Sequence, residues 1–169
     1  MYPNHLCPND WYAVTVTATV DDPLALDRQV CFALAVATRE VVALYRPVLE
    51  PLGLTHPQYL VMLALWDRDP RSLRDLADTL ALDPGTLSPL VKRLEAAGLV
   101  QRARDRADER LLAVSLTADG RRLRKQAELV PAQIVERLGL PIADLEHLNT
   151  VLRTVIAAAS GSTKIGTCQ

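Results

Sequence analysis

Residues 72–117 contain the pattern that most constrains the fold of this chain. Two segments, 73–80 and 84–97, carry apolar residues at three- and four-residue spacing and are separated by a short turn. This spacing is typical of amphipathic helices, and a short connection allows two helices to pack against each other. Two strand-like segments, 99–100 and 111–116, follow and are joined by a charged segment. The order predicts a helix-turn-helix followed by a β-hairpin.

The remainder of the chain is expected to be helical. Hydrophobic residues make up 49% of the sequence but aromatic residues only 4%, which favours helices over an aromatic-rich β-sandwich. Asp22-Pro23 is predicted to start the first helix, since a carboxylate can cap a helix that begins with proline. Further helices are expected at 57–66, 117–138 and 141–159. The sequence therefore predicts a mainly α fold with a small β-hairpin.

The charge of the chain is unevenly distributed. The formal net charge of −1 argues by itself against a nucleic-acid-binding protein. Between residues 92 and 125, however, ten basic side chains stand against five acidic ones. Such a local excess is expected where a protein meets the phosphates of DNA.

The second helix of the pair has a polar face that suits the major groove. Small and hydroxylated residues lie near its start and cations lie further along: Gly85, Thr86, Ser88, Pro89, Lys92 and Arg93. Small residues allow close approach, hydroxyls bind phosphates or base edges, and cations bind the backbone. For Lys92 and Arg93 alone, an ordinary solvated helix face explains the pattern equally well.

Arginines in and around the hairpin loop favour the DNA-binding interpretation. They are Arg102, Arg104, Arg106 and Arg110. Arginines on a protruding hairpin, or wing, can enter the minor groove, where the potential is most negative. Helix pair and wing together predict a winged helix-turn-helix that binds double-stranded DNA.

Several of these segments resemble the multiple-antibiotic-resistance-regulator (MarR) family. The resemblance covers about residues 24–159 and rests on the runs 83–95, 98–100, 106–110 and 116–117. It implies that Asp108 orients the wing by pairing with Arg110, and that Arg110 reaches into the minor groove. Members of this family are homodimers that repress transcription from near-palindromic operators, with two recognition helices about 34–36 Å apart.

In that family the first and last helices of the two subunits interleave. An apolar stripe near the end of the chain suits this role: Leu145, Leu148, Val151, Leu152, Val155 and Ile156. The expected segments are a poorly defined N-terminal extension (1–22), a dimerisation and sensor helix (23–54), the winged helix-turn-helix (55–117), C-terminal dimerisation helices (118–159) and a flexible tail (160–169). The dimerisation region is thus expected to come from both ends of the chain.

Cys31 lies early in the first predicted helix. The positive end of a helix dipole favours a reactive thiolate, whereas a cysteine on an apolar helical stripe is more often an inert core residue. Residues 26–66 resemble the organic hydroperoxide resistance regulator (OhrR) subgroup, whose sensor cysteine matches Cys31. The resemblance implies that Tyr45 hydrogen bonds this thiolate across the dimer, and that peroxide oxidation of the cysteine releases the DNA.

The chain departs from the subgroup at two places. A second tyrosine often found four residues after the sensor cysteine is replaced by Ala35. A resolving cysteine is found in the C-terminal half of some members, but here the other thiols are Cys7 and Cys168, near the two ends. Oxidised Cys31 could therefore pair with either of these thiols or with an external low-molecular-weight thiol.

Other classes of function have little support in the sequence. No histidine or carboxylate cluster has metal-ligand spacing, and no phosphate-binding loop or catalytic triad is visible, so no cofactor, no metal and no enzymatic activity are expected. No apolar run of about 18 residues predicts a membrane span, and no secretory signal is recognised. Three widely spaced cysteines do not form a disulfide framework, and a cytoplasmic location is expected.

Two alternatives remain open. One is a family member that responds to a phenolic or other aromatic ligand, bound between the dimerisation and DNA-binding regions, rather than to thiol oxidation. The other is a winged-helix protein-interaction module that no longer binds DNA, which only the negative net charge supports.

Overall fold

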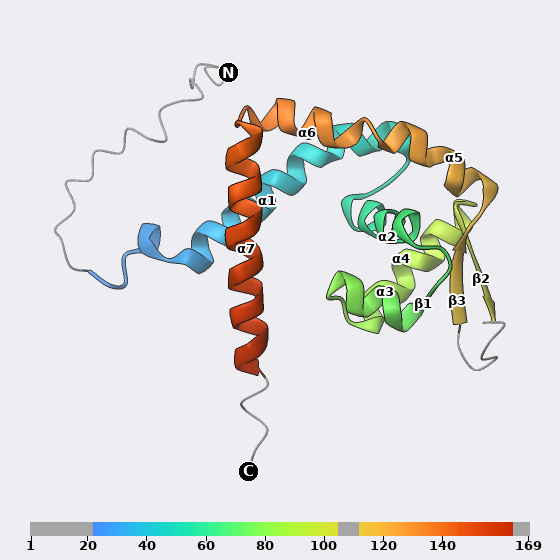
Figure 1. Ribbon diagram of the computed structural model, residues 1–169, viewed down its shortest axis with the longest axis horizontal. Coiled ribbons are helices and arrows are strands. Elements are labelled where there is room, and N and C mark those ends of the chain that lie inside the picture. Colours follow the sequence, from blue (N-terminus) through green and yellow to red (C-terminus); the bar gives the residue numbers. More distant parts are fainter. Residues whose placement is uncertain (1–21, 105–111, 164–169) are drawn as a thin grey trace, which may run out of the picture. The chain divides into compact units, whose positions relative to one another are not determined.

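The computed structural model describes residues 22–104 and 112–163 (Figure 1). Expectations for the segments 1–21, 105–111 and 164–169 lie outside the described residues. These expectations concern Cys7, Arg106, Asp108, Arg110 and Cys168. The chain divides into two compact units, one up to Arg39 and one from Glu40 onward.

The first unit contains a 3-10 turn, Leu26–Arg28, and the first half of helix α1, Val30–Leu49. The predicted helix start at Asp22-Pro23 is wrong, because α1 begins at Val30. The Asp22 carboxylate instead accepts a hydrogen bond from the backbone N–H of Leu24 at 2.9 Å, which closes a local turn. The Gln29 side chain donates to the carbonyl of Pro23 at 2.7 Å and fixes this turn against the start of α1.

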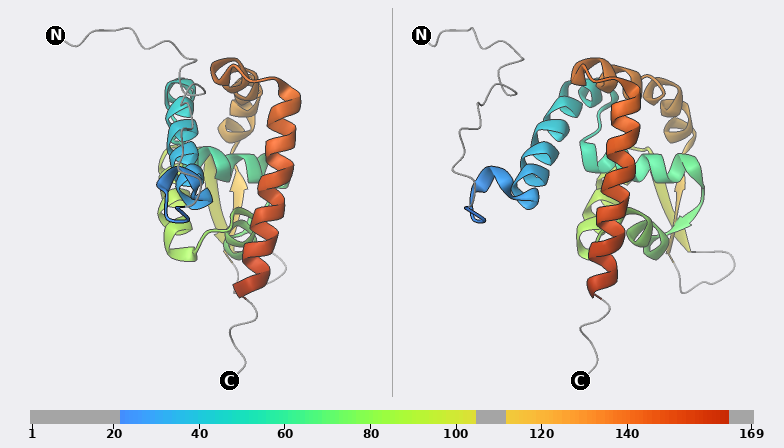
Figure 2. Two further views of the ribbon diagram at one scale, coloured as in Figure 1. Left: turned by 90° about the vertical axis from the view of Figure 1, so that its left-hand side faces the viewer. Right: turned by 60° about the vertical axis from the view of Figure 1, so that its left-hand side comes forward.

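The second unit contains the predicted helix-turn-helix. Helices α2 (His56–Asp67), α3 (Leu73–Leu80) and α4 (Pro84–Ala96) pack on one another, and α3 and α4 lie beneath α2 in Figures 1 and 2. Each start is fixed by a local cap. The Ser72 hydroxyl accepts from the N–H of Asp75 at 3.1 Å, and the Asp83 carboxylate accepts from the N–H of Thr86 at 2.9 Å.

The wing strands belong to a three-stranded antiparallel sheet with the order β1-β3-β2. Strand β2 (Val100–Arg104) pairs with β3 (Leu112–Leu116), with Val100 opposite Leu116. Strand β1 (Arg71–Ser72) pairs with the other edge of β3 and was not predicted. A strand of two residues is too short to show an alternating pattern in the sequence. It forms because it pairs with β3, which lies more than forty residues later in the chain.

The predicted helix 117–138 is two helices, α5 (Ala118–Ala127) and α6 (Val130–Leu138). Pro131 explains the interruption, because its ring cannot donate to the carbonyl of Ala127 and clashes with it. The last helix, α7, runs from Ile142 to Thr163 and so continues into the segment 160–169 that was expected to be a tail.

The hydrophobic core is centred on the helix-turn-helix. Leu49, Met62, Leu65, Leu76, Leu87 and Leu94 are among its completely buried side chains. Within residues 22–104 and 112–163, none of the helices is long and apolar enough to span a membrane. A mainly α fold with a winged helix-turn-helix is confirmed.

Candidate DNA-binding surface and cysteine site

Helix α4 has one buried and one exposed face, as the apolar spacing predicts. Leu87, Leu90, Val91 and Leu94 are buried against the rest of the helix-turn-helix. The six residues predicted to face DNA are all exposed: Gly85, Thr86, Ser88, Pro89, Lys92 and Arg93. The helix therefore presents to solvent the small, hydroxylated and cationic side chains that the sequence singled out.

The start of α4 is held by a double hydrogen bond to one carboxylate. Asp83 Oδ1 accepts from the backbone N–H of Thr86 at 2.9 Å, and Asp83 Oδ2 accepts from the Thr86 hydroxyl at 2.6 Å. The hydrogen bond from the Thr86 hydroxyl, followed by that from its N–H, lowers the pKa of Asp83. The carboxylate is therefore ionised at neutral pH and acts only as an acceptor.

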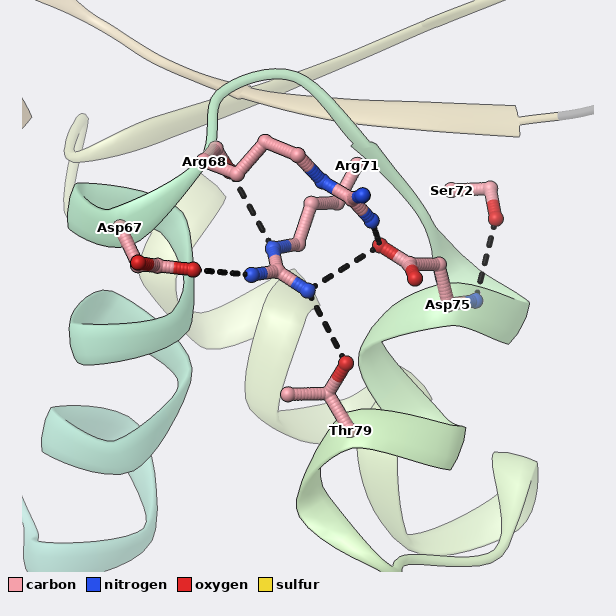
Figure 3. A network of polar contacts seen from close by, with 6 residues as sticks. All are labelled: Asp67, Arg68, Arg71, Ser72, Asp75 and Thr79. Carbon is pink, nitrogen blue, oxygen red and sulfur yellow. Dashed lines mark hydrogen bonds and ion pairs between the residues drawn. The ribbon is translucent and has the colours of Figure 1, made fainter.

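A buried arginine connects the end of α2 to α3 (Figure 3). The side chain of Arg71 is only 7% exposed, and its guanidinium donates to Asp67 Oδ2 at 2.7 Å, Thr79 Oγ1 at 2.9 Å and Asp75 Oδ2 at 3.2 Å. Arg68 closes the network by pairing with Asp75, and its hydrogen bond lowers the pKa of that carboxyl. The network fixes the angle between α2 and α3, and sequence reasoning missed it because no periodic pattern marks a buried arginine.

A second ion pair connects the candidate recognition helix to the wing. The backbone N–H of Arg102 in β2 donates to Glu95 Oε1 at 3.2 Å, and the Arg102 Nε–H donates to Glu95 Oε2 at 2.7 Å. The hydrogen bond from the Arg102 side chain lowers the pKa of Glu95. Arg102 was counted with the cations of the wing, but its charge is balanced by a carboxylate of α4.

The same correction applies to other members of the basic cluster between residues 92 and 125. The described ranges contain the pairs Arg102–Glu95, Arg121–Asp69, Arg122–Asp119 and Arg124–Glu128. By contrast, among the described residues the exposed side chains of Arg74, Lys92 and Arg93 have no hydrogen-bond or ion-pair partner. Within the described part of the chain, α3 and α4 therefore carry exposed cations without a partner, whereas four arginines of the basic cluster are paired.

The base of the wing is joined to α2 and α5 by close polar contacts. The Trp66 indole N–H donates to the carbonyl of Gly120 at 2.9 Å, and the Thr117 hydroxyl donates to the carbonyl of Gly98 at 2.6 Å. Asp69 accepts from the N–H of Leu116 at 3.0 Å and pairs with Arg121. These contacts place β3 relative to the helix-turn-helix.

Cys31 is the second residue of α1 and is exposed in the chain. Ala35, one turn later, is also exposed. Within residues 22–104 and 112–163, no group of three or more His, Cys, Asp and Glu side chains could hold a metal ion.

Tyr45 lies in an aromatic cluster near the other end of α1. Its ring contacts His56 edge to face at 4.8 Å between centroids and lies 6.1 Å from Tyr59, which in turn contacts Trp66 at 6.4 Å. Burial raises the pKa of Tyr45 and lowers the pKa of His56. Tyr45 is therefore a protonated hydrogen-bond donor at neutral pH.

Helix α7 exposes much of the predicted apolar stripe. Of its members, Leu148, Val151, Val155 and Ile156 are each at least 40% exposed, and so is Ile142 at the start of the helix. An open groove of about 860 Å³ runs along α6 and α7, and Leu145 is among its lining residues. A second cavity, of about 410 Å³, lies between α2 and α5–α6 and is lined by Tyr59, Leu63, Trp66 and Arg124, among others.

Comparisons with known proteins agree with this fold. Residues 43–127 match the family described as transcriptional regulator SarA/Rot. The chain is 41% identical to the HTH-type transcriptional regulator TtmR of Methylorubrum extorquens (strain PA1), over 86% of this chain and 76% of that protein. It is 38% identical to the organic hydroperoxide resistance transcriptional regulator of Bacillus subtilis (strain 168), over 80% of this chain and 92% of that protein.

Similar solved structures include regulators with different inputs. BpsR of Bordetella bronchiseptica, whose DNA binding is regulated by 6-hydroxynicotinic acid, has a TM-score of 0.72 and 31% identity over 79% of this chain and 97% of its own. Reduced AbfR bound to DNA has a TM-score of 0.62 and 32% identity over 78% of this chain and 95% of its own. A structure of AbfR in a disulfide form is also similar. A MarR-family regulator from Rhodococcus sp. RHA1 has a TM-score of 0.68 and 28% identity over 78% of this chain and 96% of its own.

The predictions of a MarR-type winged helix and of a regulator rather than an enzyme are confirmed by these relatives, which are transcriptional regulators. The similarity spans most of both chains in each comparison. The protein belongs to the MarR family of winged helix-turn-helix transcriptional regulators and is similar within it to the organic hydroperoxide resistance regulators.

Proposed function

We propose that the protein is a homodimeric, cytoplasmic repressor that binds a near-palindromic operator and releases it when an organic hydroperoxide oxidises Cys31. The observation that carries this proposal is the exposed cysteine in the first turn of α1, in a chain 38% identical to a hydroperoxide resistance regulator. The thiolate sulfur attacks one oxygen of the peroxide, an S–O bond forms, and the O–O bond breaks. The alkoxide leaves, takes up a proton and becomes an alcohol, while the cysteine becomes a sulfenic acid.

The sulfenic acid then condenses with a thiol, which releases water and forms a disulfide. Cys7, Cys168 or an external low-molecular-weight thiol would supply this second sulfur. Tyr45 of the other subunit is proposed to donate a hydrogen bond to the thiolate, in a dimer joined through the apolar stripe of α7.

DNA is proposed to contact the exposed face of α4 in the major groove and the wing residues Arg104, Arg106, Asp108 and Arg110 in the minor groove. The unpaired cations of α4 support this placement. The part of the DNA affinity that does not depend on base sequence should come from the release of counterions from the phosphates.

Salt titrations should separate free from paired cations. Lys92→Ala and Arg93→Ala should each reduce the slope of log K against log salt by about 1, because each removes one unpaired charge. Arg102→Ala should leave the slope nearly unchanged, because Glu95 already balances Arg102. Equal slopes for all three variants would contradict the assignment, and weak, salt-independent binding by the wild type would favour the protein-interaction module.

The redox proposal is tested by replacing the sensor thiol. Operator affinity of the wild type should fall at least about tenfold after one equivalent of cumene hydroperoxide, whereas Cys31→Ser should bind equally before and after treatment. Affinity is measured by fluorescence anisotropy in the presence of a low-molecular-weight thiol. The double variant Cys7→Ser/Cys168→Ser should keep the response to peroxide if the external thiol supplies the second sulfur, and should lose it if Cys7 or Cys168 does. Peroxide-induced release by Cys31→Ser would refute the proposal.

A ligand-responsive regulator is a second candidate, favoured by the cavity of about 410 Å³. Tyr59 and Trp66 in its walls suit an aromatic ring, and BpsR responds to an aromatic acid. The carboxylate of such a ligand would have to displace Glu128, which also lines the cavity, from Arg124. Retained operator binding under peroxide, together with release by salicylate that is lost in Arg124→Ala, would establish this candidate instead.

A further inference from the structure

The exposed face at the start of α4 has little capacity to donate hydrogen bonds. A hydroxyl group carries one proton, and the Thr86 hydroxyl donates its proton to Asp83 Oδ2 at 2.6 Å. Gly85 has no side chain and Pro89 has no polar side-chain atom. Within the described residues only Ser88 offers a free hydroxyl on the first two turns of this face.

The cap also fixes the orientation of the threonine. Asp83 accepts from both the N–H and the hydroxyl of Thr86, so rotation of the side chain away from Asp83 would remove the hydroxyl donor from an ionised carboxylate. Both residues are exposed, so a DNA groove could approach them. What Thr86 offers to such a groove is its methyl group and the lone pairs of its oxygen.

We propose that Thr86 determines part of the operator sequence by packing its methyl group against the 5-methyl group of a thymine. The thymine methyl is the one apolar group on the base edges of the major groove, and threonine methyls suit it. A guanine presents only acceptors at the corresponding edge, and Thr86 has no proton to give them. The inference rests on the proposed DNA binding and adds the base feature that α4 recognises.

The test removes single methyl groups from the DNA. The probe is the duplex that the wild-type protein selects from a randomised library, with each thymine of the half-sites replaced in turn by deoxyuridine. The replacement leaves the hydrogen-bonding groups of the base unchanged. At one thymine per half-site, affinity should fall about fourfold, and about fifteenfold when both half-sites are replaced, as expected for the loss of one buried methyl contact each.

Two variants of Thr86 identify the contact. Thr86→Val keeps a methyl group and loses the hydroxyl, so it should retain the sensitivity to deoxyuridine. Thr86→Ser keeps the hydroxyl for Asp83 and loses the methyl, so its affinities for the two duplexes should be equal. Far-UV circular dichroism verifies that each variant is folded.

Three results would overturn the inference: no effect of deoxyuridine at any position, sensitivity that persists in Thr86→Ser, or sensitivity that is lost in Thr86→Val. The last result would mean that the methyl group of Thr86 does not by itself make the contact. Failure of the wild type to select any duplex would instead refute the proposed DNA binding, so the two failures are distinguishable.

Discussion

Gly120→Ala should lose at least about 3 kcal/mol of stability, because the added methyl group would collide with backbone. A Cβ at this position would lie 2.1 Å from the carbonyl oxygen of Leu99 and 3.2 Å from Cδ2 of Leu116. The Leu99 carbonyl cannot move freely, since it accepts the N–H of Thr117 at 3.1 Å. Gly120 itself is held by its carbonyl, which accepts from Trp66.

Gly161→Ala is the matched control. Gly161 also lies in a helix, but an added Cβ would meet nothing within 4 Å, so alanine should be neutral or stabilise by up to about 1 kcal/mol. Urea denaturation followed by circular dichroism gives both midpoints, and the m-values show whether the comparison is of stability alone. Equal midpoints for the two variants would contradict the clash.

Gly120 illustrates what the sequence could and could not predict. Thr117 and the residues after it predict the start of a helix, and the Thr117 hydroxyl does accept from the N–H of Gly120 at 3.1 Å. The need for glycine, however, arises from the carbonyl of Leu99, twenty-one residues earlier. Local capping chemistry is visible in a sequence, whereas close approach between distant backbones is not.

The candidate site shows the same division. The exposed and buried faces of α4 follow from a period of 3.6 residues, so all six predicted surface positions are exposed. The electrostatics do not follow from a count of charges, because Arg102 is neutralised by Glu95, a partner that only the packing of β2 on α4 supplies. The interruption after Ala127 could have been predicted from Pro131, which cannot donate a hydrogen bond to the carbonyl of Ala127, although α1 and α4 continue through Pro47 and Pro89.

Substitutions around Arg71 should have the second large effect on the free energy of unfolding. The informative result is the order of stability of the variants. Arg71→Met should cost about 2–3 kcal/mol through lost hydrogen bonds. It leaves no buried charge unpaired, since the Asp67 side chain is 78% exposed and Asp75 keeps Arg68. The double variant Asp67→Ala/Asp75→Ala should be less stable than Arg71→Met, because it strands a guanidinium that is only 7% exposed.

Adding Arg71→Met to that double variant should therefore restore stability, so that the triple variant is more stable than the double. Chemical denaturation of the four proteins completes the cycle. A triple variant less stable than the double would show that the buried guanidinium needs no carboxylate.

The pH dependence of stability provides an independent check. Asp75 has a lowered pKa in the folded protein, so its contribution to stability is present above its unfolded pKa and is lost as the pH falls through the folded pKa. Stability of the Asp67→Ala/Asp75→Ala variant should consequently fall less steeply on the acid side than that of the wild type, because Asp75, whose pKa is lowered mainly by the hydrogen bond from Arg68, is no longer there to be protonated.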